Sequence, residues 1–296
     1  MASTLDLKRR VRSITNTRKV TKAMELVASA RLRRSQMRIE AMRPYADRML
    51  ELMAGVSQAA GAVRLPLLEW RATIQKVAIV PITADRGLAG GFNAQVIRRS
   101  LALMREVRAD GQEAVWFSTG RKAASTLRFR RLNVSQSWVG FSERPAYSDA
   151  QAIAHAVSEA YVNGDVDRVV IVYNAFVSAL VQKVTVRDVL PIPQDLLEAD
   201  LEGADRSTGT PDFIYEPEPE EILARLLPVY VETELYRALL ESAASEQGAR
   251  MTAMRNASKA AGELIDSLTL AMNRARQAEI TQEILEVVAG ADALSG

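Results

Sequence analysis

Residues 250–283 read RMTAMRNASKAAGELIDSLTLAMNRARQAEITQE, a stretch with no proline and a single glycine. Apolar or small residues recur in it at alternating steps of three and four, and the same steps extend upstream. The positions on this repeat are Leu240, Ala244, Gln247, Met251, Met254, Ser258, Ala261, Ile265, Leu268, Met272, Ala275, Glu279 and Gln282. Such a repeat, held over about six heptads, is typical of a long coiled-coil helix. We therefore predict a helix from about Tyr230 to Val288, roughly 90 Å long.

The N-terminal region predicts a second helix of matching length. No glycine or proline occurs before Pro44, and helical spacing resumes after it, so we expect one helix to about residue 58 with a bend at Pro44. Its apolar stripe, with a shift in the middle, consists of Leu7, Val11, Ile14, Val20, Met24 and Val27. Residues 5–57 are about as many as residues 230–282, so the two helices can pair antiparallel along their whole length.

The C-terminal helix would extend past this partner beyond Leu285. Apolar side chains occupy more than one face there, namely Ile280, Ile284, Leu285, Val287 and Val288. An apolar tip exposed to water requires an apolar receptor or sleeve. The alternative is a tip that folds back onto the rest of the chain, although nothing between Gln277 and Gly290 breaks the helical pattern.

Strands alternate with helices between the two long helices, which predicts an α/β layer with a mostly parallel sheet. The expected strands are 77–83, 114–117, 134–139, 169–173 and 181–189, the last two as an antiparallel hairpin. The expected helices are 94–108, 120–127 and 148–162, the last capped by Ser148. The fold class is therefore α/β, a long antiparallel two-helix coiled coil with a central Rossmann-like α/β domain.

The predicted segments are an N-terminal coiled-coil helix at 1–60, an α/β domain at 74–194, a loop at 195–212 and a C-terminal coiled-coil helix at 213–296. Pro228 should interrupt or kink the start of the last segment, because an interior proline costs about 3 kcal/mol. Residues 1–43 contain twelve Lys or Arg and three Asp or Glu, whereas residues 195–221 contain ten Asp or Glu and one Arg. Such blocks indicate charged partners.

Composition and patterning exclude several classes of site. The chain has no cysteine, so it has no disulfide, thiolate metal site or cysteine nucleophile. Its one histidine, His155, cannot form a multi-histidine site, and we expect it on an exposed helix face. No apolar run reaches transmembrane length, and the charged N-terminus lacks the apolar core of a signal peptide.

A glycine-rich loop, DRGLAGG at residues 85–91, lies between a predicted strand and a predicted helix, where a dinucleotide loop would lie. Its glycines are spaced GxxGG, and no Lys-Ser/Thr pair follows, so it matches neither phosphate-binding motif. We interpret it as a tight turn in which glycines supply positive φ. The basic N-terminal helix leaves a second interpretation open, a coiled-coil nucleic-acid-binding protein with an α/β domain.

Three motifs, in order along the chain, resemble those of the γ subunit of the rotary F-type ATP synthase. They are ITNTRKVTKAMELVA at residues 14–28, SEQGARMTAM at residues 245–254, and the C-terminal positions Ile280, Thr281, Glu283, Glu286, Gly290, Ala291 and Ala293. The resemblance covers essentially the whole chain. Gly248 departs from it, because an alanine is expected there, and a glycine would weaken the helix by about 0.5–1 kcal/mol.

The resemblance implies a rotor shaft that couples ion-driven rotation of a membrane ring to ATP synthesis or hydrolysis. The chain would be a non-catalytic subunit of the proton-translocating enzyme, without a cofactor or a bound metal. Its partners would be the α and β subunits, the ε subunit and the membrane c-ring, without nucleic acid or a transmembrane segment of its own. It would be peripheral, on the cytoplasmic face of the bacterial plasma membrane.

The resemblance also assigns partner contacts to particular residues. The positions implied to contact the catalytic ring are Lys19, Lys22, Met24, Arg276, Gln277, Thr281 and Glu283. Of these, Lys19, Lys22 and Met24 would face an acidic lever loop of a β subunit. The hydrophobic bearing would consist of Ile280, Ile284, Leu285, Val287 and Val288. Tyr215 and Glu216 would face the ion ring and the ε subunit.

Overall fold

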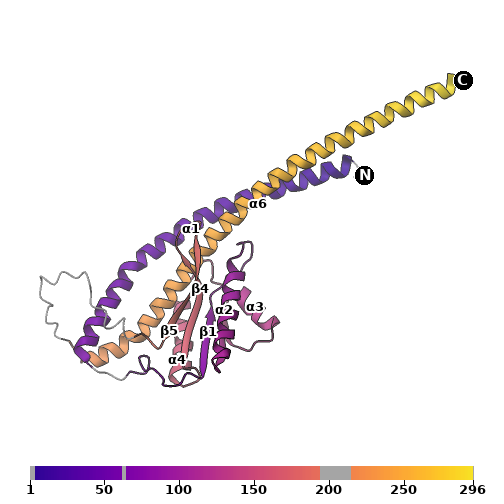
Figure 1. The fold of residues 1–296 in the computed structure, drawn as a ribbon. Coiled ribbons are helices and arrows are strands. Elements are labelled where there is room, and N and C mark those ends of the chain that lie inside the picture. Colours follow the sequence, from indigo (N-terminus) through magenta and orange to yellow (C-terminus); the bar gives the residue numbers. More distant parts are fainter. Residues whose placement is uncertain (1–3, 62–64, 194–214, 296) are drawn as a thin grey trace. The chain divides into compact units, whose positions relative to one another are not determined.

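The computed structural model describes residues 4–61, 65–193 and 215–295, with side chains as far as Gly290 (Figure 1). The predicted loop 195–212 lies outside the described residues. The elements are α1 (Thr4–Ala60), β1 (Lys76–Pro81), α2 (Phe92–Ala109), β2 (Glu113–Thr119), α3 (Arg121–Phe129), β3 (Val134–Trp138), α4 (Tyr147–Val162), β4 (Arg168–Phe176), β5 (Gln182–Leu190) and α6 (Pro219–Ser295). Both long helices and every predicted strand are present.

The chain forms two compact units, and each long helix contributes to both. One unit combines Met1–Ala28 with Arg250–Gly296, and the other is Ser29–Ala249. The division falls inside α1 and α6, whereas the four predicted segments divide the chain at the ends of these helices. The two units are described separately below.

A five-stranded sheet forms the centre of the larger unit, in the order β3-β2-β1-β4-β5. The first four strands are parallel, and β4 pairs with β5 antiparallel, which confirms the predicted hairpin. From β1 the chain passes through α2 and adds β2 and then β3 on one side of β1. It then returns through α4 and adds β4 on the other side of β1. The order in which strands are added to the sheet therefore reverses at β1, as in doubly wound nucleotide-binding folds.

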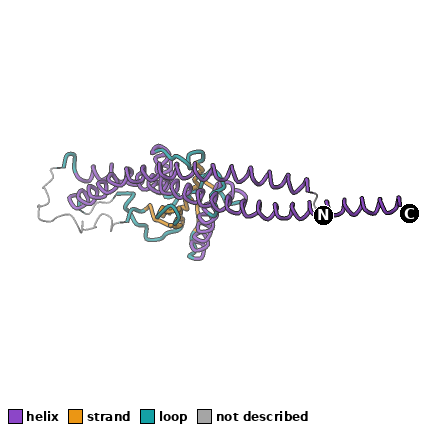
Figure 2. Tube along the Cα trace, turned by 90° about the horizontal axis from the view of Figure 1, so that it is seen from above, coloured by secondary structure: helices purple, strands orange, loops and turns teal. Residues whose placement is uncertain are grey.

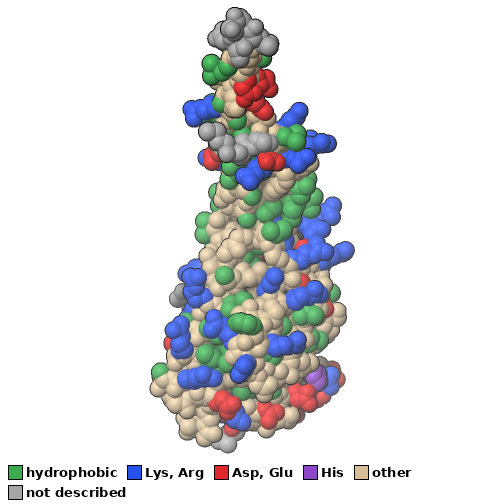
Figure 3. Space-filling view, turned by 90° about the vertical axis from the view of Figure 1, so that its right-hand side faces the viewer, with side chains coloured by type: hydrophobic (Ala, Val, Ile, Leu, Met, Phe, Trp, Pro, Cys, Tyr) green, Lys and Arg blue, Asp and Glu red, His purple; other side chains and the backbone are tan. Residues whose placement is uncertain are grey.

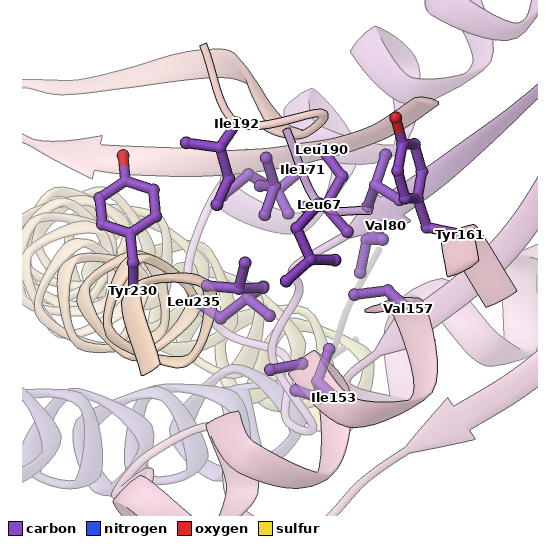
Figure 4. Close-up of a cluster of buried hydrophobic side chains, with 14 of the residues drawn as sticks. Leu67, Val80, Ile153, Val157, Tyr161, Ile171, Leu190, Ile192, Tyr230 and Leu235 are labelled. Atoms are coloured by element: carbon purple, nitrogen blue, oxygen red, sulfur yellow. The ribbon is translucent and has the colours of Figure 1, made fainter. Parts of the chain in front are cut away.

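Alternate residues of β1 face two separate cores, because successive side chains of a strand point to opposite faces. Val77 and Ile79 pack with α2 and α3. Ala78 and Val80 pack with α4, with the end of α1 and with the first turns of α6 (Figure 4). In Figure 4, Ile153 and Val157 of α4 and Leu235 of α6 point toward the same space as Val80 and Ile171. The start of α6 therefore belongs to the core of this unit.

The β4–β5 hairpin also packs closely on α6. The hydroxyl of Ser245 donates to the carbonyl oxygen of Asn174 at 2.9 Å. A Cβ atom at Gly248 would lie 2.9 Å from the carbonyl oxygen of Ala179, too close for ordinary contact. Gly248 therefore allows the hairpin backbone to approach the helix, and the expectation that it only weakens the helix was incomplete.

The smaller unit is an antiparallel pair of helices with a regular seam (Figure 2). On α1 one register of alternating steps of three and four joins the buried or half-buried residues Thr4, Leu7, Val11, Ile14, Thr21, Glu25 and Ala28, with the exposed Arg18 between Ile14 and Thr21. Arg18 keeps the same register, and its guanidinium covers Gly262 of α6. The predicted shift of the stripe was therefore wrong, and Val20 and Val27 are exposed. Polar residues continue the seam where apolar residues were expected.

On α6 the predicted seam holds to Ala275 and then ends. Its half-buried or buried positions in this unit are Met251, Met254, Ser258, Ala261, Ile265, Leu268, Met272 and Ala275. Glu279 and Gln282 are exposed, so the predicted repeat extended too far. Thr4, the first described residue of α1, lies at this level, because its hydroxyl donates to Glu279 at 3.0 Å, so no described residue of α1 packs against the positions beyond it.

Two local expectations were also wrong. The interruption predicted at Pro228 is absent, because α6 runs continuously from Pro219 to Ser295, and packing of the buried neighbours Leu227 and Val231 offsets the hydrogen bond that the proline lacks. Ser148 does not cap α4, which begins at Tyr147. Asp149 instead accepts a hydrogen bond from the N–H of Ala146 at 2.7 Å and so satisfies a free amide at the helix start.

Candidate functional site

The candidate surface on α1 contains a buried ion cluster. Glu25 lies in the seam, nearly buried, and its carboxylate pairs with Lys22 at 3.0 Å and with Arg255 of α6 at 3.1 Å. Hydrogen bonds from Lys22, and then from Arg255, lower the pKa of Glu25 below its ordinary value. One face of the predicted contact residue Lys22 is therefore occupied within the chain, although its side chain is still 59% exposed.

The outward side of this surface combines cations with apolar side chains. Lys19 is exposed and Met24 is half-buried beside the seam. Val20, Leu26 and Val27 are 58%, 63% and 52% exposed. These three valine and leucine residues were missed as surface residues, and a heptad count continued from Ile14 would have placed them outward. Exposed apolar side chains that are rimmed by polar residues mark sites of interaction with other proteins.

The second candidate surface lies on α6 beyond the end of the seam. Arg276, Gln277, Thr281 and Glu283 are all exposed, as expected for residues that contact another chain. The hydroxyl of Thr281 donates to the carbonyl oxygen of Gln277 at 2.9 Å, within the helix. The structure brings these four residues onto one segment, and their contacts with partners stay a prediction.

The tip of α6 is two-sided. Ile280, Ile284, Leu285, Val287 and Val288 are 47–72% exposed, so the tip does not fold back onto the chain. At 3.6 residues per turn these five residues fall within an arc of about 160°. The opposite side carries the carboxylates Glu279, Glu283 and Glu286. Apolar residues were expected on more than one face of the tip, and the structure places them on one broad face, opposite an acidic face.

The third candidate pair, Tyr215 and Glu216, immediately precedes α6. Tyr215 is half-buried, packs at the edge of the core, and has its hydroxyl oxygen 3.6 Å from the Cβ position of Gly55 on α1. Glu216 is exposed. Tyr215 therefore anchors this segment to its own unit, and only the carboxylate of Glu216 is fully presented to solvent.

The side chain of Asp85, the first residue of the glycine-rich loop, is bonded to backbone groups around the loop. The carboxylate of Asp85 accepts hydrogen bonds from the N–H groups of Arg121, Gly140 and Ser142 at 3.0, 2.9 and 3.1 Å. Arg121 is the first residue of α3, where a bound phosphate would receive such bonds. The carboxylate thus joins the start of the loop to the turn after β3 and to the first N–H group of α3.

The glycines of this turn act as expected only in part. Gly90 has a φ of 56°, but Leu88 also adopts a positive φ, 63°, with its side chain in solvent. Gly120 permits the closest approach, because a Cβ atom there would lie 2.0 Å from the carbonyl oxygen of Thr83. These features make the turn a structural junction of β1 and α3.

The described residues were also compared with the requirements of a metal site. No cluster of His, Cys, Asp or Glu suited to a metal ion occurs among the described residues. His155 is 83% exposed and lies 3.7 Å from Glu159, which confirms its predicted place on a helix face. The fold and its exposed surfaces define a two-helix coiled-coil protein with an attached α/β domain, whose prominent surfaces suit contacts with other chains.

Comparison with known proteins gives the family. A family model described as ATP synthase matches residues 3–294. The ATP synthase gamma chain of Rubrobacter xylanophilus is 43% identical over 295 residues, which cover 100% of this chain and 99% of that protein. That of Pelotomaculum thermopropionicum is 46% identical over 294 residues, 99% of this chain and 100% of that protein. The chain belongs to the ATP synthase gamma chain family, which confirms the resemblance of its three motifs.

Solved structures support the fold. A chain in the cryo-EM structure of the Tetrahymena thermophila mitochondrial ATP synthase central stalk and c-ring matches with a TM-score of 0.59 and 29% identity, over 81% of this chain and 99% of that chain. A chain of the Euglena gracilis mitochondrial ATP synthase matches with a TM-score of 0.69 and 19% identity, over 98% and 94%. Among the described residues, no helix has the length and apolarity needed to cross a membrane.

Proposed function

We propose that this chain is the central rotor shaft of a rotary ATP synthase. One observation carries the proposal, namely that α6 continues beyond the paired part of α1 and ends in an exposed helix with an apolar face and an acidic face. An isolated helix of this kind is marginal in water and gains its stability from packing against other chains. Membership of the gamma chain family over the full length supports a sleeve of α and β subunits as that packing.

In this role the chain transmits rotation and does not perform chemistry. The membrane c-ring, with the ε subunit bound alongside, drives the larger unit near Glu216. The helix pair then presents a different surface to each β subunit in turn and biases its nucleotide affinity through contacts that differ between states. The β subunits hold the catalytic residues, and the chain is a non-catalytic subunit of the enzyme complex.

The proposed contacts with the catalytic ring combine weak attraction with apolar sliding. Lys19, Lys22 and Met24 face an acidic lever loop, where two opposite charges at 4 Å attract by only about 1 kcal/mol in a water-like dielectric. Such a contact pushes without locking. Arg276, Gln277, Thr281 and Glu283 meet loops nearer the tip, and the five apolar tip residues form the bearing.

In this proposal the complex lies at the cytoplasmic face of the bacterial plasma membrane, and this chain is a peripheral subunit of it. The nucleic-acid-binding alternative has no support in the comparisons, because the relatives reported above are gamma chains.

A rotation assay tests the proposal directly. Because the chain has no cysteine, Ser125→Cys on α3 provides one attachment point for a bead, in a complex whose α and β subunits are fixed to a surface. We expect the bead to turn in one direction when ATP is added, and the purified chain alone to release no phosphate from ATP. A bead that stays still in a complex that hydrolyses ATP would refute the shaft, as would hydrolysis by the chain alone.

A further inference from the structure

A groove between α2 and α3 lies on the outer face of the larger unit, away from the surfaces assigned above. Its volume is about 600 Å³, and it is lined by Ala94, Ile97, Arg98, Leu101, Met104, Arg105, Thr126 and Arg130. The residues from Ala94 to Arg105 span about 16 Å along the helix axis, or three helical turns. The groove is therefore long enough to hold a short helix.

The floor of the groove is an apolar stripe. Ile97, Leu101 and Met104 follow one another at i, i+4 and i+7 on α2, and each is only half-buried. This spacing places the three side chains on one face of α2, and a hydrophobic groove of this kind can receive the apolar face of another amphipathic helix. Met104 adds an unbranched side chain that can adapt its shape to the partner.

The rim of the groove is basic. Residues 92–131 contain nine Lys or Arg and three Asp or Glu, and Figure 3 shows how frequent basic side chains are on the molecular face that it presents. Arg99 pairs with Glu106 at 2.7 Å, on the same helix. By contrast, no described carboxylate forms an ion pair with the rim residues Arg98, Arg105 and Arg130, whose charges stand along both walls. An occupant of complementary charge would be acidic.

We propose that the α2–α3 groove binds an acidic amphipathic helix of a partner protein. The apolar face of that helix covers Ile97, Leu101 and Met104, and carboxylates on its flanks meet Arg98 and Arg130. An apolar floor distinguishes this occupant from nucleic acid or an anionic lipid surface, each of which would need cations without a continuous apolar stripe. The proposal does not depend on the rotor function.

Binding of a synthetic helix to the full-length chain tests the proposal. The probe is a fluorescent peptide of about 15 residues with leucines at i, i+4 and i+7 and glutamates on both flanks. The control peptide has the same composition in an order that forms no apolar stripe. We expect saturable binding of the first peptide by fluorescence anisotropy, and binding of the control peptide at least tenfold weaker.

Two double variants with the same change in net charge separate the groove from general electrostatics. Arg98→Glu with Arg130→Glu reverses the rim, and Arg108→Glu with Arg128→Glu reverses exposed cations of the same two helices that do not line the groove. We expect the rim variant to lose at least tenfold in affinity and the matched variant less than threefold, with equal thermal transitions by circular dichroism.

Three results would overturn the proposal. One is the absence of saturable peptide binding at concentrations up to about 1 mM, which corresponds to a binding free energy near −4 kcal/mol. Another is an equal loss in the two double variants. The third is tighter binding of phosphatidylglycerol vesicles or duplex DNA than of the peptide, with the loss confined to the rim variant, because the groove would then recognise a polyanion.

Discussion

Replacing Gly248 by alanine tests whether the β4–β5 hairpin is held rigidly against α6. Alanine favours the helix over glycine by about 1 kcal/mol. The new methyl group, however, would lie 2.9 Å from the carbonyl oxygen of Ala179 and 3.1 Å from the side-chain nitrogen of Gln182. Forcing one carbon into a filled site costs about 1–3 kcal/mol. The gain is therefore cancelled or exceeded, and we expect Gly248→Ala to leave stability unchanged or lower it by up to about 2 kcal/mol.

Gly262→Ala is the matched control, because it makes the same change on the same helix. Its nearest neighbour would be the guanidinium carbon of Arg18 at 3.8 Å, an ordinary contact. We expect this variant to gain about 1 kcal/mol, so the two variants should differ by about 1–3 kcal/mol. Thermal unfolding followed by circular dichroism measures each change, at roughly 2–4 °C per kcal/mol for the larger unit, which contains Gly248, and roughly 4–8 °C per kcal/mol for the smaller unit, which contains Gly262.

Hydrogen exchange locates the effect. In Gly248→Ala, the amides of residues 174–182 should exchange faster than in the parent chain, because the hairpin must move away from α6. In Gly262→Ala, the same amides should be unchanged. Equal stabilisation by the two substitutions, with an unchanged hairpin, would refute the claim that close backbone approach requires the glycine.

Three further changes test the helix pair and its proposed bearing. Met24→Lys should leave assembly with α and β subunits intact but lower the ratio of ion pumping to ATP hydrolysis, because a new cation binds the acidic lever; an equal fall in both rates would contradict this. Ending the chain after Gln282 removes four of the five apolar tip residues, so the complex should dissociate at a lower denaturant concentration while its ATP hydrolysis largely persists. An intact complex without hydrolysis would argue against a bearing. Glu25→Gln should lower the stability of the helix pair at neutral pH. Because the pKa of Glu25 is depressed in the folded chain, the gap between the two proteins should be complete above the ordinary glutamate value of 4.5 and close as pH falls through the lower folded value; a gap independent of pH would show that the ion cluster does not stabilise the pair.

The order of elements could be predicted from the sequence because each has a strong periodic signal. The β-branched run at 77–83 and the alternation of strands and helices sufficed for the sheet and its hairpin. The seam of α1 could not be followed beyond Ile14 from apolarity alone. Arg18, Thr21 and Glu25 continue it through a long side chain and an ion cluster, which no hydrophobic pattern reveals.

The end of the seam and the role of Asp85 could not be predicted without three-dimensional information. Nothing in the repeat distinguishes Ala275 from Glu279, because the difference lies in where the opposite helix begins. Likewise, no pattern in the sequence distinguishes Asp85 from other aspartates. Its carboxylate acquires a role only when the turns after β1 and β3 and the start of α3 converge on it.

The two-sided tip of α6 has a consequence for symmetry. Ile284 and Leu285 lie on one side of the helix and Glu279 and Glu286 on the other, so the axle has a chemical front and back. Inside the proposed sleeve, subunits of identical sequence would meet unlike surfaces at any instant. Each subunit would contact the apolar face and then the acidic face of α6 as the tip turned. A uniformly apolar helix would present the same surface to every subunit at every rotation angle. This helix presents a surface that differs with the angle of rotation.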